Sequence, residues 1–494
     1  MIVQIIQHLV TVVPSLGFAL LVAQTCAMSA ADTKNLIAGT LIAMGISTAL
    51  NAWGGRLGAG GFFVNIPNFD FMFIGPAAIA AAGLAGLAGE ALIAALTCFL
   101  LRPLLPRMRE LLPSTVVGTV VCMTGITLTV PAVKTSLGVD AAMRADPVVA
   151  CISLVSLATI VGISVWGARR FKILAVIAGL VVGNLLTVFT GRMSLPEDFS
   201  SQPLFGAPQL IMPTLDLPLA TLIGAVLISI LGQIYNLGCT VVMDKQTDAD
   251  WRRPDMRSAG GVFTANGIGD MIASFMGGIG TCIGSSNLAL ASASKTVSRH
   301  IGLTMGLILV ALAFLPKAVA FVTLMLPLPV QGALQLYTAV FMFVGGIELA
   351  TSRAPSNRTT FILGISICAG IAVLIMPGIA EHAPPDVKLV LSNGYLVTGI
   401  VAFVLNLIFR VGTGRTAECR FDDMQRPVAD VISGFLESQG GQWQVRRDVL
   451  QRAFSRLTRG QSLFQPRAAA ACTRSVDALT NSIWMSSCAT AESP

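Results

Sequence analysis

Apolar segments long enough to cross a bilayer recur from near the first residue to about Arg410, and this pattern constrains the fold most. Residues 173–186, 301–315 and 360–376 are almost purely apolar, and a membrane-spanning helix needs about 20 mostly apolar residues. The mean hydropathy is +0.77. Charged residues make up 12% of the chain, about half the fraction of a typical soluble domain. The sequence therefore predicts an integral membrane protein.

The hydropathy pattern predicts an all-α polytopic protein with about fourteen transmembrane spans. By residue number these are 4–24, 34–52, 62–78, 82–101, 114–133, 147–166, 173–190, 217–243, 260–276, 283–297, 301–324, 332–350, 359–377 and 391–409. Arginine and lysine concentrate in alternate short loops, and such loops face the cytoplasm. We therefore expect both termini to be cytoplasmic in a plasma (inner) membrane. The first span lacks a basic leading segment and is expected to be a permanent helix rather than a signal peptide.

The chain divides into two halves and a tail. Prolines and acidic residues cluster between Pro203 and Pro218, and about seven spans are expected on each side. An odd number of spans per half makes the halves inverted relative to one another, which is an architecture of secondary transporters. We predict inverted repeats over 1–205 and 206–410. A polar cytoplasmic tail follows over 411–494, with amphipathic helices between Asp422 and Leu457 interrupted at Gly440-Gly441.

One span in each half is interrupted. Residues 58–71 and 277–288 both run from clustered glycines through an extended stretch to an asparagine, and then into helix-compatible sequence. Non-helical backbone is tolerated at membrane depth where protein or a polar cavity satisfies it. Helix N-termini there would present free N–H groups to a small ligand. The alternative is that these glycines only allow close helix packing.

Several segments within residues 1–410 resemble the nucleobase–ascorbate transporter family, which includes the xanthine and uracil permeases. The segments are Gln7-His8, Pro67-Asn68-Phe69-Asp70-Phe71, Leu112–Thr119, Ser286-Asn287-Leu288-Ala289 with Ser294-Lys295, Leu315-Pro316-Lys317 and Leu326–Val330. The resemblance implies a core domain and a gate domain, with short strands from spans 3 and 10 meeting at the substrate. It also implies movement of the core against the gate, a homodimer, and coupling to protons or sodium.

The chain departs from the family's pattern at the acidic positions. A glutamate of the eighth span corresponds to Gln233, and an aspartate of the ninth span corresponds to Asn266. The signature begins with Ser286 instead of glutamine or glutamate. Neutral amides and a hydroxyl therefore replace the acids of the typical site.

These residues suit a nucleobase, whose edge alternates hydrogen-bond donors and acceptors. An amide offers both from one planar group, so Asn68, Gln233 and Asn287 with the hydroxyl of Ser286 are candidate readers of that edge. Phe69 or Phe71 could cover a ring face. Each amide could instead bridge helices.

Coupling needs a titratable group or an ion site, and ionisable residues inside a membrane are usually functional. Asp70, beside the first interruption, is the first candidate. Asp270, with Asn266 one turn before it, and His8 follow. Glu90 and Glu348 are expected to pair with basic residues or to reach helix ends. Without a titrating group, the protein would be an uncoupled facilitator.

The sequence also bears on other classes of function. The 10 cysteines and 3 histidines show no paired metal-ligand spacing. The sequence also shows no nucleophile–base pair and no phosphate loop, so neither an enzyme nor a cofactor is expected. The basic excess falls in inner loops and the tail, which indicates lipid contact and not nucleic acid. A small-anion transporter of the same fold, for sulfate, bicarbonate or a carboxylate, and a non-transporting sensor remain alternatives.

Overall fold

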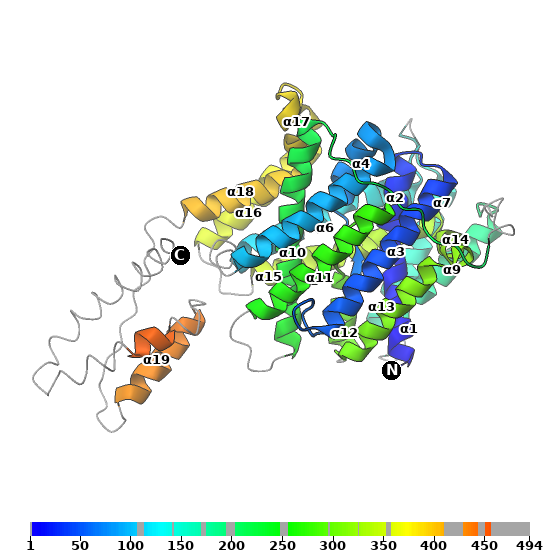
Figure 1. Ribbon diagram of the computed structural model, residues 1–494. Helices are drawn as coiled ribbons and strands as arrows, with labels where there is room; N and C mark the ends of the chain where they lie inside the picture. Colours follow the sequence, from blue (N-terminus) through cyan, green and yellow to red (C-terminus); the bar gives the residue numbers. More distant parts are fainter. Residues whose placement is uncertain are drawn as a thin grey trace, which may run out of the picture. The chain divides into compact units, whose positions relative to one another are not determined.

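The computed structural model describes residues 2–105, 113–140, 143–168, 174–193, 203–247, 255–294, 297–324, 326–351, 357–409, 428–442 and 450–455. The chain divides into two compact units (Figure 1). The first comprises residues 1–249 and 255–408, and the second the remainder. The fold is mainly helical, as the sequence predicts.

The first unit is a succession of apolar helices. In chain order they are α1 (Ile2–Val12), η1 (Val13–Ser15), α2 (Leu16–Thr25), α3 (Ala30–Trp53), α4 (Phe71–Leu101), η2 (Arg102–Leu104), α6 (Ser114–Leu137), α7 (Pro147–Trp166), α9 (Ala175–Phe189), α10 (Leu219–Thr247), α11 (Met256–Met276), α12 (Ser285–Ser294), α13 (Arg299–Ala313), α14 (Pro316–Leu324), α15 (Leu328–Ala350), α16 (Asn357–Ile375), η3 (Pro377–Ala380), α17 (Pro385–Leu391) and α18 (Gly394–Ile408).

Two short strands lie inside the two predicted interruptions. Strand β1 covers Asn65–Pro67 and precedes α4, and strand β2 covers Thr281–Ile283 and precedes α12. Since each strand is followed by a helix, two helix N-termini are held at this sheet.

The helices break at two points that bear on the predicted spans, one between two predicted spans and one within a predicted span. Helix α4 carries non-helical backbone at Ala82 and at Gly83, where φ is +60°, so the predicted third and fourth spans are two arms of one hairpin. Glycine tolerates this left-handed conformation. The predicted span 301–324 is divided into α13 and α14 before Pro316, because proline cannot continue a preceding helix without losing a hydrogen bond.

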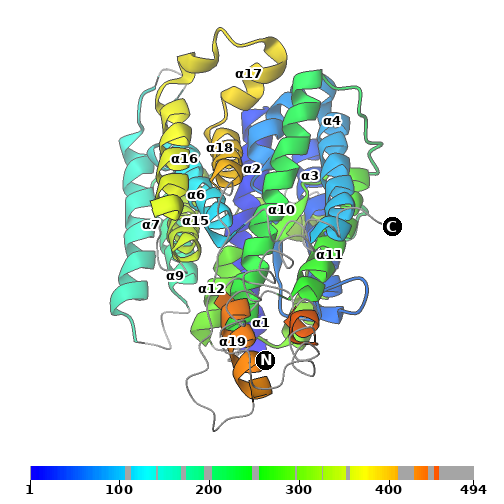
Figure 2. The same cartoon turned by 90° about the vertical axis from the view of Figure 1, so that its left-hand side faces the viewer.

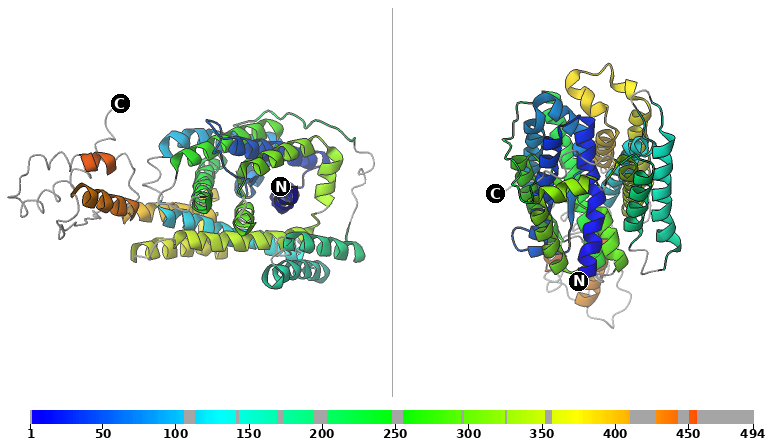
Figure 3. Two further views of the ribbon diagram at one scale, coloured as in Figure 1. Left: turned by 90° about the horizontal axis from the view of Figure 1, so that it is seen from below. Right: turned by 90° about the vertical axis from the view of Figure 1, so that its right-hand side faces the viewer.

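The helices of the first unit form two packed groups. One contains α6, α7, α9, α15, α16 and α18; the other contains α3, α4, α10, α11 and α13 around the strands. Figure 2 shows α7, α9, α15 and α16 along one side and α3, α4 and α11 along the other. The left panel of Figure 3 shows the teal and yellow-green helices of the first group below the blue and green helices of the second. We call these the outer group and the strand group.

The surface fits a bilayer. Within the described residues, eight helices are long and apolar enough to cross a membrane, and three apolar helices are shorter. The outward faces of α7 and its neighbours expose large apolar side chains, such as Leu154 (67% exposed) and Trp166 (82% exposed). This arrangement makes the chain a multi-pass membrane protein. The exact number of spans and the inverted repeats stay predictions.

In the second unit, helix α19 covers Val428–Gln442. It continues through Gly440 and Gly441, so these glycines do not interrupt it as the sequence analysis expects. A Cβ on Gly440 would lie 2.5 Å from the side chain of Leu450, which shows that the two helical segments of this unit contact one another. The other tail residues named above lie outside the described residues.

Candidate functional site

The two strands pair antiparallel, with Asn65 opposite Ile283, Ile66 opposite Cys282 and Pro67 opposite Thr281. Two backbone hydrogen bonds extend the ladder at its ends. The N–H of Asn68 donates to the Gly280 carbonyl at 2.7 Å, and the N–H of Gly284 donates to the Val64 carbonyl at 2.9 Å. The interrupted segments of the two halves therefore meet inside the strand group.

Asp270 of α11 holds strand β2. Its Oδ1 atom accepts from the backbone N–H of Thr281 at 2.5 Å and from the Thr281 hydroxyl at 3.2 Å. The Thr281 hydroxyl also lies 3.2 Å from that of Ser47 on α3. Asp270 is thus a structural anchor in this state, and its role in coupling stays a prediction.

A chain of three buried asparagines holds strand β1. Asn51 of α3 donates to Oδ1 of Asn65 at 3.0 Å, and Asn65 donates in turn to Oδ1 of Asn266 on α11 at 2.6 Å. The backbone N–H of Asn65 donates to the Thr48 hydroxyl at 2.9 Å. Asn266, a candidate for coupling, therefore binds the strand through Asn65.

Helix α10 contacts the sheet at Ile283, the last residue of β2. The Asn236 side chain accepts from the backbone N–H of Ile283 at 2.9 Å and donates to Oε1 of Gln233 at 3.3 Å. The Tyr235 hydroxyl donates to the Ile283 carbonyl at 3.0 Å. Gln233 is buried, so the predicted substrate amide lies beside β2.

His8 and Asn287 form a contact at the end of β2. His8 Nδ1 donates to Oδ1 of Asn287 at 3.0 Å, and the His8 ring packs edge-on against Phe62 at 4.7 Å between centroids. The Asn287 amide nitrogen lies over Gly284, because a Cβ there would lie 3.1 Å from it. Ser286 is half-buried next to this pair.

Asn68 and Asp70 lie at the opposite end of the ladder. The backbone N–H of Asp70 donates to Oδ1 of Asn68 at 3.0 Å, and Asp70 immediately precedes α4. A Cβ on Gly232 of α10 would overlap Oδ2 of Asp70 and lie 3.4 Å from Nδ2 of Asn68. Both side chains therefore pack against the backbone beside Gln233.

The strands separate Asn68 from Asn287. Val64 and Asn68 flank β1 on its two sides, and four residues of extended chain span about 13 Å. Asn68 and Asn287 therefore serve different ends of the sheet and do not lie next to one another.

Aromatic rings surround Phe69, which is fully buried. Its ring contacts those of Tyr235 at 5.2 Å, Phe18 at 6.4 Å and Tyr395 at 6.5 Å, all edge-on. Tyr395, on α18 of the outer group, also stacks on Phe73 at 5.7 Å. Phe71, in contrast, belongs to an apolar core cluster with Leu87 and Ile279.

Buried polar atoms around the sheet lack hydrogen-bond partners among the described residues. They are both carboxyl oxygens of Asp70, Nδ2 of Asn287, Oγ of Ser285, the Tyr395 hydroxyl, Oδ1 of Asn51 and Nδ2 of Asn266. Native proteins leave few such atoms unsatisfied. Their concentration here indicates a site that receives a polar ligand or water.

The sequence analysis missed Asn65, Asn236 and Tyr395. Tyr395 offers a signal in retrospect, since the chain has only 3 tyrosines and two of them, Tyr235 and Tyr395, are fully buried beside Phe69. Asn65 stands within a predicted interruption, where the sequence analysis assigns no role to its side chain. Asn236 lies one turn after Gln233 on the same helix.

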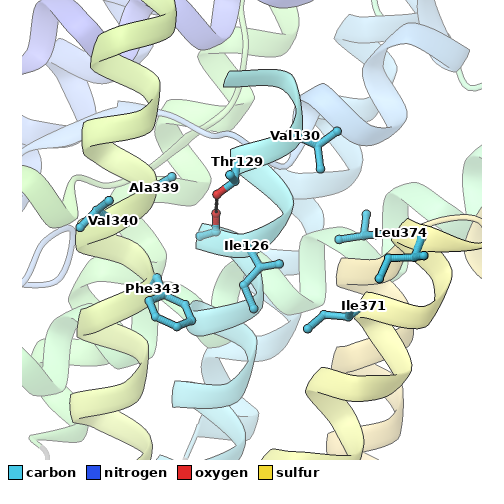
Figure 4. A pocket seen from close by; sticks show the side chains of 10 residues that line it. Ile126, Thr129, Val130, Ala339, Val340, Phe343, Ile371 and Leu374 are labelled. Atoms are coloured by element: carbon cyan, nitrogen blue, oxygen red, sulfur yellow. Dashed lines mark hydrogen bonds between the residues drawn. The ribbon is translucent and has the colours of Figure 1, made fainter. Parts of the chain in front are cut away.

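An apolar groove of about 480 Å³ opens elsewhere, between α6, α15 and α16 (Figure 4). Ile126, Phe343 and Leu374 line it. The hydroxyl of Thr129, a polar group on its wall, donates back to the Gly125 carbonyl at 2.9 Å. Such a groove suits apolar chains better than a nucleobase, and none of the candidate site residues lines it.

Comparison with known proteins assigns the family. The xanthine/uracil permease model, described as "Permease family", matches residues 1–379. The chain belongs to this permease family. The permease is 25% identical over 414 residues to the nucleobase transporter PlUacP of Paenibacillus larvae, a match that covers 81% of this chain and 92% of that protein. It is also 25% identical to the xanthine permease XanP of Escherichia coli, over 82% of this chain and 90% of XanP.

Solved structures share the fold of the permease at low sequence identity. The transmembrane domain of the cyanobacterial bicarbonate transporter BicA matches 82% of this chain and 96% of its own, with a TM-score of 0.51 and 18% identity. The structure of SLC26A9 matches 82% of this chain and 66% of its own, with a TM-score of 0.56 and 15% identity. These likenesses confirm a transporter fold and carry no information on the solute.

Proposed function

We propose that this permease carries a purine or pyrimidine nucleobase of the xanthine, urate or uracil type across the plasma membrane. The supporting observation is the group of unpartnered polar atoms at the β1–β2 sheet, next to the aromatic rings around Phe69. A flat heterocycle needs this combination of hydrogen-bonding groups and apolar ring contacts. The names of the relatives support the same solute class.

The substrate would lie between Gln233, Phe69 and the first turn of α12, where Ser286 and Asn287 stand. Gln233 offers a donor and an acceptor, and Asn287 offers the amide nitrogen that His8 leaves free. Asn68 would act from the far end of the sheet by holding Asp70. Solutes that left these buried groups unpaired would be rejected strongly.

Transport would follow from the two helix groups. The strand group would act as the core that carries the substrate, the outer group as the gate, and the core would move like an elevator against the gate. Symport with a cation, proton or sodium, would drive uptake. Homodimer formation and cytoplasmic termini complete the proposal.

A small anion is the competing solute. The polar side chains around the sheet include the carboxyls of Asp70 and Asp270 and, among the described residues named above, no lysine or arginine. Like charges at short distance oppose one another, so these carboxyls favour a neutral solute. The likeness to anion carriers rests on fold alone.

Uptake of radiolabelled xanthine, urate and uracil tests the proposal, with sulfate and bicarbonate as competitors. Cells without their own nucleobase uptake should accumulate at least one base when they express the permease. Asn287→Ala and Gln233→Ala should abolish this uptake without loss of protein from the membrane. The exposed positions Asn357 and Gln246 provide matched controls, Asn357→Ala and Gln246→Ala. Unchanged uptake in both site variants would refute the site, and competition by an anion alone would favour the other solute.

A further inference from the structure

Helix α4 places a second acid near Asp70. Its two arms fold back at Ala82 and Gly83, and a Cβ on Gly86 would overlap the Ala78 carbonyl. A Cβ on Gly75 would lie 3.5 Å from Oε2 of Glu90. Gly75 follows Asp70 by little more than one helical turn, so the Glu90 carboxyl lies over the start of the helix that Asp70 begins.

Glu90 does not pair with a basic residue or reach a helix end, contrary to the sequence expectation. It is 1% exposed, and neither carboxyl oxygen has a hydrogen-bond partner in the described part of the chain. The hairpin explains this, since the return of the chain at Gly83 directs Glu90 inward against Gly75. In contrast, Glu348 on α15 is exposed.

Asp70 resembles Glu90 in its burial and in its unpartnered carboxyl oxygens. It is also 1% exposed, with both carboxyl oxygens unpartnered among the described residues. The Tyr395 hydroxyl of α18 lies near its carboxyl, although no hydrogen bond of standard geometry joins them. Two buried groups without a hydrogen-bond partner among the described residues, Tyr395 of the outer group and Asp70 of the strand group, therefore lie near one another.

The charged and titratable groups around the two acids include no cation within the described residues. Glu90 interacts electrostatically with Asp70. Asp70 interacts with Tyr395 of α18 and with the Cys282 thiol of β2, on which Asp270 of α11 also acts. On α10, the neighbour of Asp70 is Gly232, which carries no charge.

Two neighbouring carboxylates without a cation cannot both stay charged in a buried site, because desolvation and mutual repulsion add together. The pair titrates as a unit, and one bound proton removes one of the two charges, which lowers both the desolvation cost and the repulsion. We propose that Asp70 and Glu90 form a carboxyl pair that holds a shared proton, and that this proton is the ion coupled to transport. The second half of this proposal rests on the proposed function.

The pair also accounts for Gln233. Where the family resemblance would place an acid on the eighth span, this chain has an amide, and the Asp70 carboxyl packs against the adjacent Gly232. The acid is thereby supplied from the third span. The Tyr395 hydroxyl would contact Asp70 only while the two helix groups keep this arrangement, so movement between them would expose the proton to release.

Infrared spectroscopy of the purified permease in nanodiscs tests the pair without any substrate. The difference spectrum between the wild type and the double variant Asp70→Asn/Glu90→Gln should show the C=O stretch of a protonated carboxyl at neutral pH. This band should shift in D₂O and should persist in sodium-free choline buffer. Glu348→Gln, the same change at an exposed position, should leave it intact.

Two other infrared results would contradict the proposal of a shared proton. A difference spectrum without this C=O band would show that the pair is ionised. A band that appears only in choline and disappears in sodium would identify a sodium site instead. Circular dichroism of each variant in the same nanodiscs separates these outcomes from misfolding.

Uptake measurements test the coupling. In Glu90→Gln the loss of a neighbouring negative charge should move the midpoint of the pH dependence of uptake to lower pH by about one unit, which is a tenfold change in proton affinity. Asp70→Asn should abolish the dependence. An unchanged pH profile in both variants refutes coupling through the pair. If the wild type takes up none of the bases, the proposed function fails while the infrared result still decides the pair.

Discussion

Gly232 of α10 determines how closely the Asp70 carboxyl can approach Gln233. A methyl group there would overlap Oδ2 of Asp70, and overpacking a buried site costs about 1–3 kcal/mol. We expect Gly232→Ala to reduce nucleobase uptake about tenfold or more, since about 1.4 kcal/mol corresponds to a tenfold change. The measurement is initial-rate uptake, normalised to permease in the membrane.

Gly364→Ala on α16 is the matched control. No described atom lies within 4 Å of the position where its Cβ would stand, so this variant should transport like the wild type. If Gly232→Ala also transports normally, Asp70 does not depend on the backbone of α10, and its position in the site is wrong.

At the scale of the elements, the pairing of β1 with β2 brings segments from both halves together. Ile66 faces Cys282 directly, and residues that form a hydrogen-bonded antiparallel pair have Cα atoms about 5.5 Å apart. This distance suits a disulfide bond. Ile66→Cys should therefore form a cross-link to the native Cys282 in the membrane under a mild, membrane-permeant oxidant.

Peptide mass spectrometry would identify the linked segments. Ile79→Cys on α4, beyond the sheet, is the comparison and should give no link to Cys282. A link from residue 79 and none from residue 66 would show that the strands pair in another register or not at all.

The elements were largely predictable from the sequence, and their contacts were not. The glycines at 58–61 and 277–280 mark both interruptions, because glycine and polar residues weaken a helix locally. The hydrophobic pattern predicts that the chain turns back between the spans 62–78 and 82–101, but it cannot show that Glu90 then packs against Gly75, which is why the burial of Glu90 was missed. The register of the strands depends on contacts between residues about 200 positions apart, such as Asn65 with Asn266 (201 positions), and these leave no local pattern.

Some of the site residues were likewise predictable from the sequence, and others were not. Asn287, Gln233 and Asp70 follow from the motif resemblance, and the structure places all three near the sheet. Of their partners, His8 and Tyr395 come from other helices, so their roles follow from tertiary packing, whereas Asn236 lies one turn after Gln233 on the same helix. His8 is a coupling candidate in the sequence analysis, and its hydrogen bond to Asn287 gives it at least a positioning role.

At the scale of the whole unit, glutamines of α15 join the outer group to α2, a helix that packs against α3, α4 and β1 of the strand group. Nε2 of Gln331 donates to the Gly17 carbonyl at 2.6 Å, and Nε2 of Gln335 lies 3.4 Å from the same oxygen. In the proposed cycle the two groups move past one another, so these bonds must open. A buried hydrogen bond contributes about 1 kcal/mol.

Gln331→Leu should therefore lower the thermal midpoint of the purified permease by a few degrees and change the maximal rate of uptake. Gln246→Leu, at an exposed end of α10, should alter neither property. Equal stability and equal rate in Gln331→Leu would show that the contact to Gly17 does not hold the two groups.

The distance along the chain between the partners of the sheet has a consequence for biosynthesis. The hydrogen-bond partner of His8 is Asn287, which is synthesised 279 positions later. The partner of Asn65 is Asn266, which is also in the second half of the chain. While the ribosome is still translating the second half, the amides and backbone groups of the first half are already in the lipid without their partners, where unsatisfied polar groups are costly. The nascent permease therefore needs the membrane insertion machinery to shelter its first half until α12 has been made, and chains that stop before that helix should be substrates for membrane quality control.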